Sequence, residues 1–157
     1  MRRETILLVD DSPDDVLLIR LALARAGINH LLTVVPDGEK ALLYLRGESP
    51  YTDRTAFPLP KLLLLDLAMP KMGGFELLEW IRRQPQLSHL PVVVLTGSAL
   101  LADSKRAFEL GANSFVTKPA DLTELTLALK EVAQTWLGRT LPPGPSAPET
   151  RDLRPPP

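Results

Sequence analysis

The sequence contains no cysteine, which excludes disulfide bonds and thiolate metal sites. Lys and Arg number 18 against 19 Asp and Glu, so a net charge of −1 gives no long-range attraction to nucleic acid or to an anionic membrane. Long apolar runs are also missing, since Asp, Pro or Gly interrupts each candidate short of the roughly 20 residues that span a bilayer. The first apolar run, residues 6–9, is too short for a signal-peptide core. We therefore expect a soluble, cytoplasmic protein that binds neither nucleic acid nor membrane.

Short runs rich in Leu and Val recur along the chain and are continuous rather than alternating. This pattern is typical of strands that are buried on both faces of a parallel sheet. It predicts strands at residues 6–9, 31–35, 62–65 and 92–95, with a weaker fifth run at 114–117.

The segments between these runs carry signals for the starts and ends of helices. Ser12 and Pro13 suit an N-cap and a first helical position, and Gly27 suits a left-handed helix end. Further helices are predicted over residues 38–46, 75–83, 102–110 and from Asp121 onward. Strand and helix thus alternate five times, which predicts a doubly wound α/β fold of the flavodoxin-like type, with strand order 2-1-3-4-5.

The domain boundaries follow from composition. With 157 residues and 45% hydrophobic content, one domain is expected, over residues 4–137. Residues 47–60 form a longer connection than usual and contain three prolines. Residues 138–157 are rich in proline and poor in apolar side chains, so we expect a disordered tail.

Polar side chains occupy the carboxyl ends of four predicted strands. Asp10 and Asp11 follow the first strand, Asp66 the third, Thr96 the fourth, and Lys118 the fifth. Ligands of open α/β sheets bind outside these ends, near the point where strand order reverses. We therefore expect the five side chains to share one pocket.

The donor types in this pocket favour a hard cation. Three neighbouring carboxylates repel one another unless a cation joins them, and with no nearby His or Cys the oxygen ligands suit Mg²⁺. A Mg²⁺ site that is partly open supports phosphoryl transfer, and an aspartate can accept the group as an acyl phosphate. Asp66 is the best placed nucleophile, with Lys118 and Thr96 as stabilising groups.

These residues carry a resemblance to a known family. Asp10-Asp11, Asp66 with Met69-Pro70 and Gly74, Thr96, and Lys118-Pro119 resemble the receiver domains of two-component response regulators. The resemblance implies that a sensor histidine kinase phosphorylates Asp66. It also implies that Asp11, Asp66 and the backbone carbonyl of Ala68 bind Mg²⁺ directly, while Asp10 acts through water.

The same resemblance implies further roles near the phosphoryl group. Lys118 would pair with it, across a cis peptide bond to Pro119, and Thr96 and Phe115 would move together as a switch. The long connection at 47–60, the ending Trp136-Leu137 and the lack of an output domain make the chain most similar to the small response regulators of phytochrome-type histidine kinases.

Other interpretations stay open for several of these residues. Asp10-Asp11 alone could be an N-cap cluster, and Phe115 could simply fill the core. Asp14 and Asp15 are expected to act as capping and dipole acids, not as ligands. The chain could be a degenerate receiver that serves as a docking module. An aspartyl-phosphate phosphatase is a weaker alternative, since Ala68 occupies the position of its general acid; we expect no enzyme activity beyond the chain's own phosphorylation and dephosphorylation.

The end of the last helix predicts self-association. Trp136 and Leu137 fall in the last turn, where the core gives little cover, and would leave a large apolar patch on a monomer. We expect a homodimer through the face made by the fourth helix, the fifth strand and the fifth helix. The alternative is that Trp136 folds back over the first helix.

Overall fold

A single parallel sheet organises the chain, in a computed structural model that describes residues 4–67, 72–97 and 100–137. Its strands run in the order β2-β1-β3-β4-β5. The strands are β1 (Thr5–Val9), β2 (Leu31–Val35), β3 (Leu62–Leu65), β4 (Val92–Thr96) and β5 (Ser114–Thr117). The predicted fold class and strand order are confirmed.

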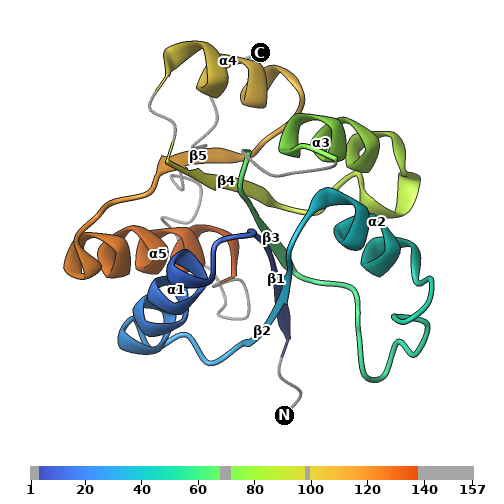
Figure 1. Ribbon diagram of the computed structural model, residues 1–157, viewed down its shortest axis with the longest axis horizontal. Helices are drawn as coiled ribbons and strands as arrows, with labels where there is room; N and C mark the ends of the chain where they lie inside the picture. Colours follow the sequence, from blue (N-terminus) through green and yellow to red (C-terminus); the bar gives the residue numbers. More distant parts are fainter. Residues whose placement is uncertain (1–3, 68–71, 98–99, 138–157) are drawn as a thin grey trace, which may run out of the picture.

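In the described ranges, five α-helices cover the two faces of the sheet. They are α1 (Pro13–Arg25), α2 (Gly38–Arg46), α3 (Gly74–Arg83), α4 (Leu101–Glu109) and α5 (Leu122–Trp136), with a 3₁₀ turn, η1 (Pro85–Leu87), after α3. Helices α1 and α5 lie on one side of the sheet and α2, α3 and α4 on the other (Figure 1). Within the described ranges, no helix combines the length and the apolar character that crossing a membrane requires.

Alternate residues of the central strands supply two separate hydrophobic cores. Leu63 and Leu65 of β3 pack with α2 and α3, whereas Leu62 and Leu64 pack with α1 and α5. All four are buried, which explains why the sequence of β3 is continuously apolar. Neighbouring strands are in register, with Val9 opposite Leu65, so β1 and β3 end at the same edge of the sheet.

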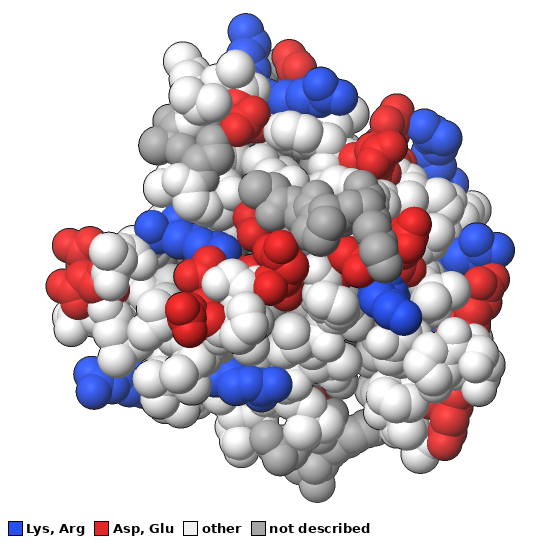
Figure 2. All heavy atoms as spheres, viewed as in Figure 1, with Lys and Arg blue, Asp and Glu red and all other residues white. Residues whose placement is uncertain are grey.

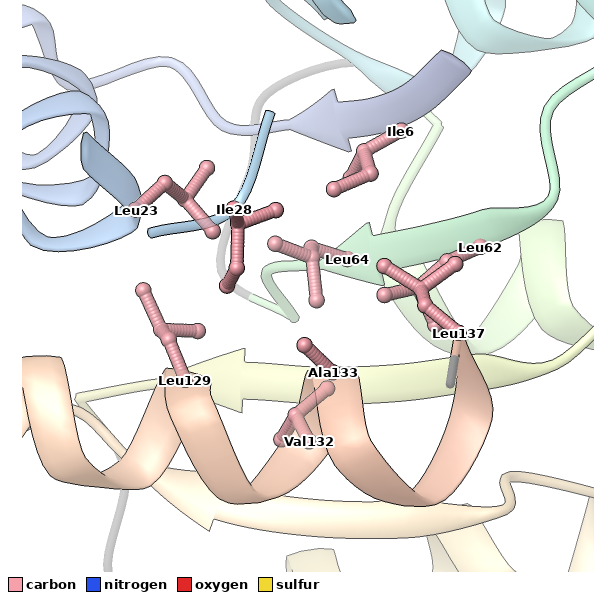
Figure 3. A pocket seen from close by; sticks show the side chains of 9 residues that line it. All are labelled: Ile6, Leu23, Ile28, Leu62, Leu64, Leu129, Val132, Ala133 and Leu137. Carbon is pink, nitrogen blue, oxygen red and sulfur yellow. The ribbon is translucent and has the colours of Figure 1, made fainter. Parts of the chain in front are cut away.

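The core on the side of α2 and α3 is called the first core, and the core on the side of α1 and α5 the second. The last turn of α5 packs in the second core. Leu137 donates its backbone N–H to the carbonyl of Ala133 at 2.7 Å, so the chain keeps its helical course one residue past α5. Leu137 therefore continues the stripe of Leu129 and Ala133, and is buried. Figure 3 shows these side chains with others from α1, β1 and β3 around an apolar seam that leaves no room for a water molecule.

This packing corrects the expected apolar patch at the end of α5. Trp136 is partly buried and packs against the same core, and its indole Nε1 is buried without a hydrogen-bond partner among the described residues. The prediction of an exposed Trp136-Leu137 surface is wrong, because a stripe with four-residue spacing carries the core contact to the helix end.

The connection from α2 to β3 is held by one arginine. Arg54 donates from Nη1 to the carbonyls of Tyr44 and Phe57, at 2.8 and 3.0 Å, and from Nη2 to that of Leu45 at 2.9 Å. The buried Tyr44 donates its hydroxyl to Pro58, at 2.7 Å, and its ring lies 5.1 Å from that of Tyr51. The extra length of residues 47–60 thus forms a packed cover over the end of α2, remote from the polar strand ends.

Candidate functional site

The backbone places the polar side chains by extending the sheet one residue past its strands. The N–H of Asp10 donates to Val35 at 3.1 Å, and the N–H of Asp66 donates to Val9 at 3.0 Å. The N–H of Lys118 donates to Thr96 at 2.7 Å. These bonds continue the ladders of β1, β3 and β5, so the side chains have positions set by the sheet rather than by loops.

Three carboxylates meet at this edge of the sheet. Asp10, Asp11 and Asp66 each present an oxygen, and these oxygens lie within 4.8 Å of one another. Asp10 and Asp66 are buried, whereas Asp11 is exposed at the mouth. Figure 2 shows acidic side chains gathered near the middle of the face that it views. Oxygen donors this close, one of them open to solvent, fit a hard divalent cation such as Mg²⁺.

Lys118 is the cation of the site in the described structure. Its Nζ donates to Asp10 Oδ2 at 2.7 Å and to Asp15 Oδ2 at 2.8 Å. The distance from Nζ to Asp66 Oδ2 is 3.6 Å, which is longer than a hydrogen bond. One ammonium therefore faces several carboxylates and does not neutralise them all.

The pKa values of two groups in the site are both raised, for different reasons. Burial raises the pKa of Asp10 above 3.8, against the opposing effect of the hydrogen bonds from Lys118 and Ser12. Burial would lower the pKa of Lys118, but its hydrogen bonds to Asp10 and Asp15 outweigh this effect and raise that pKa above 10.5. Lys118 is thus positively charged near neutral pH. The ionised form of Asp10 is disfavoured by its burial.

Asp15 is the residue whose place the sequence analysis missed. It caps α1 through its backbone, because its N–H donates to the Ser12 hydroxyl at 3.2 Å, but its carboxylate points into the site. Asp15 was predicted as a capping and dipole acid that is not a ligand, and its contact with Lys118 was not predicted. A signal was available, since side chains in a first helical turn lean toward the helix N-terminus, and here that end follows β1.

The other predicted residues lie around this cluster. Thr96 is buried at the end of β4, and Phe115 is partly buried in β5 and packs against the first core. Gly74 opens α3 so close to β3 that a Cβ would lie 2.7 Å from the backbone oxygen of Asp66. Position 74 therefore requires glycine, because α3 begins so close to the backbone of Asp66 that no side chain fits.

Two predictions concern peptide bonds and the loop after β3. The peptide bond between Lys118 and Pro119 is not cis; the cis bond in the described part of the chain joins Ser49 and Pro50. Trans is the lower-energy isomer by about 0.5–1 kcal/mol, and Lys118 already reaches Asp10 with it. Ala68, with its carbonyl, and Met69-Pro70 lie outside the described residues.

Comparisons with known proteins agree with this arrangement. The model of the response regulator receiver domain matches residues 6–130. The probable methanogenesis regulatory protein FilR2 of Methanothrix harundinacea is 38% identical over 141 residues, which are 90% of this chain and 88% of that protein.

Two solved structures resemble the chain over nearly their whole length. The phosphorylated cyanobacterial phytochrome response regulator RcpA has a TM-score of 0.80 and 37% identity, covering 90% of this chain and 98% of RcpA. The Mn²⁺-bound form of Rcp1, a response regulator of Synechocystis, has a TM-score of 0.76 and 36% identity, covering 88% of this chain and 97% of Rcp1.

Proposed function

Because the chain belongs to the response regulator receiver family, we propose that it is a cytoplasmic switch that accepts a phosphoryl group from a sensor histidine kinase on Asp66. The observation that carries the proposal is the placement of Asp66 at the end of β3, beside two further carboxylates and the Lys118 ammonium. In this proposal residues 4–137 are the receiver, and Gly138 begins a tail that the switch does not need.

The transfer makes one bond and breaks one. A carboxylate oxygen of Asp66 attacks the phosphorus of the donor phosphohistidine, and the oxygen–phosphorus bond forms as the phosphorus–nitrogen bond breaks. The histidine nitrogen keeps the bonding electrons, and one proton taken up by the imidazole ring leaves it neutral. The product is an acyl phosphate on Asp66. The chain's own contribution is to hold the nucleophile and an ammonium in place.

The proposed metal ligands are Asp11 and Asp66 directly and Asp10 through water. Bound Mg²⁺ would supply positive charge to the phosphoryl oxygens as the group is transferred. The oxygens of these three residues lie within 4.8 Å of one another, which supports this assignment. The Mn²⁺-bound form of Rcp1 is a similar chain with a divalent cation.

The response to phosphorylation is proposed to pass through Thr96 and Phe115. The buried Thr96 hydroxyl would turn toward the phosphoryl group, and Phe115, only partly buried in β5, would move inward behind it. The surface of α4, β5 and α5 would then change. In this reading the only reaction of the protein is on itself, and its output is an altered contact surface.

A phytochrome-type histidine kinase is the proposed donor. This part rests on the similarity to RcpA, a phytochrome response regulator, at 37% identity over 98% of that chain. Transfer from a phytochrome-type kinase, compared with transfer from a kinase of another sensory class, would test it. Equal rates from both would contradict the assignment.

The test of the phosphoacceptor uses a small donor. The parent, incubated with acetyl phosphate and Mg²⁺, should gain one phosphoryl group by intact-mass spectrometry, and Asp66→Asn should gain none. Asp14→Asn is the matched control, because Asp14 is an exposed acid in the first turn of α1. Label that persists on Asp66→Asn would move the acceptor role to another residue.

A homodimer through α4, β5 and α5 remains a proposal, on different residues from those first expected. Leu101 of α4 and Leu127 of α5 are 80% and 62% exposed, which leaves apolar surface on these two helices for a second copy to cover. The mass from light scattering should double with beryllofluoride and Mg²⁺, and Leu101→Ser with Leu127→Ser should prevent this. Leu17→Ser, which removes a leucine 57% exposed on α1, is the control. A parent that stays monomeric would refute the dimer.

A further inference from the structure

The Lys118 ammonium donates hydrogen bonds to two acids that are not the proposed phosphoacceptor, and its ion pair with Asp66 is longer. Its distances are 2.7 Å to Asp10 and 2.8 Å to Asp15, against 3.6 Å to Asp66. Asp10 is fully buried, so its ion pair with Lys118 lies in the protein interior. The Asp15 side chain is 38% exposed and lies at the rim. Asp15, which is not one of the three clustered carboxylates, therefore draws Lys118 toward the rim.

Asp15 is free to make this contact because of how α1 is capped. An acid at the third helical position commonly turns back to accept from the backbone N–H of the N-cap residue. Here the N–H of Ser12 donates instead to Asp10 Oδ1, at 3.0 Å. The Asp15 carboxylate is thus released from the cap and turns to Lys118 while its own N–H still donates to the Ser12 hydroxyl.

We propose that Asp15 is a positioning residue that holds the Lys118 ammonium away from Asp66 until a phosphoryl group competes for it, an inference that rests on the proposed function. A phosphoryl group on Asp66 needs the ammonium within hydrogen-bond distance of its oxygens. Lys118 can keep Asp10 and exchange Asp15 for the phosphoryl group, since the exposed contact is the weaker of the two. Asp15 would thereby slow phosphorylation and lower the stability of the phosphorylated state.

The first test measures the rate of phosphorylation by acetyl phosphate at saturating Mg²⁺. Asp15→Asn should react about two- to fivefold faster than the parent, the factor that corresponds to a partly exposed ion pair. Asp14→Asn, which removes the adjacent exposed charge of α1, should leave the rate unchanged, and Asp15→Glu should restore the slower rate. An unchanged or slower Asp15→Asn would overturn the proposal.

The second test separates positioning from a general effect of charge. If Asp15 acts through the lysine, Asp15→Asn should have no effect on the residual rate of a Lys118→Gln chain. An acceleration that persists without the lysine would mean that Asp15 only repels the anionic donor, and would also overturn the proposal.

The third test needs no phosphoryl group and so separates this inference from the proposed function. The ¹H–¹⁵N NMR signal of the Lys118 ammonium, recorded without donor or metal, should shift strongly in Asp15→Asn and little in Asp14→Asn. A signal that Asp15→Asn leaves in place would show that the carboxylate does not hold the lysine in solution. If Asp15→Asn shifts the Lys118 signal but the parent is never phosphorylated, the result would contradict the proposed function instead.

Discussion

The Asp10 carboxylate, whose side chain has no exposed surface, accepts a hydrogen bond of 2.7 Å from the Lys118 ammonium at the edge of the sheet. Both Asp10 oxygens are occupied, because the second accepts from the Ser12 N–H at 3.0 Å. Even so, the cost of burying the charge exceeds these gains and the pKa of Asp10 stays above its ordinary value. The pair is thus held in place by the fold and makes a site that would gain from additional positive charge.

The raised pKa predicts how Asp10 affects stability as the pH changes. The folded chain binds the Asp10 proton more tightly than the unfolded chain does, so this group's contribution to stability falls as pH rises from 3.8 through the raised folded pKa. The free energy of unfolding of the parent minus that of Asp10→Asn should therefore decrease over this window, without metal. Urea titrations at a series of pH values measure it. A difference that grows with pH would contradict the assignment.

Removing Asp11 should weaken the proposed metal site. Without Asp11, Mg²⁺ would lose a carboxylate at the solvent-exposed mouth, and its affinity by calorimetry should fall by about tenfold or more. The parent should also melt at higher temperature with Mg²⁺ than with EDTA, and Asp11→Ala should lose this difference. Asp14→Ala should keep both properties. Full phosphorylation of the parent in excess EDTA would contradict a role for the metal.

Enlarging Gly74 should strain the end of β3. A Cβ at this position would lie 2.7 Å from the Asp66 oxygen and 2.9 Å from Leu67 Cα, and neither backbone atom can move aside easily. Gly74→Ala should lower the free energy of unfolding by about 1–3 kcal/mol and slow phosphorylation of Asp66. Gly97→Ala, where no atom of the described residues lies within 4 Å of the added methyl, is the control for stability. Equal stability of both variants would refute the steric argument.

The tail should be dispensable. Its composition offers too little apolar surface to offset the entropy lost on ordering it, and α5 already closes the second core with Leu137. A chain that ends at Leu137 should melt within a few degrees of the full chain and be phosphorylated at the same rate. A larger loss of thermal stability would show that residues 138–157 pack on the domain.

Local patterns in the sequence were sufficient to predict the architecture. Runs such as residues 62–65 are apolar at every position, and only a strand covered on both faces buries all of them, so a doubly wound sheet follows. The carboxyl ends of parallel strands share an edge, which is why Asp10, Asp66 and Lys118 could be placed together from their positions in the chain.

Only the tertiary structure decided which partner each side chain takes. Asp15 and Lys118 are 103 residues apart, and their contact depends on a cap in which Asp10 takes the N–H that Asp15 would otherwise accept. Leu137 was expected at the surface, yet the path of α5 against the sheet buries it. The sequence by itself determined the strands, the helices and the edge where the polar groups meet, because these depend on local periodicity. Hydrogen-bond pairing and burial depend on distances between elements, which no local pattern contains.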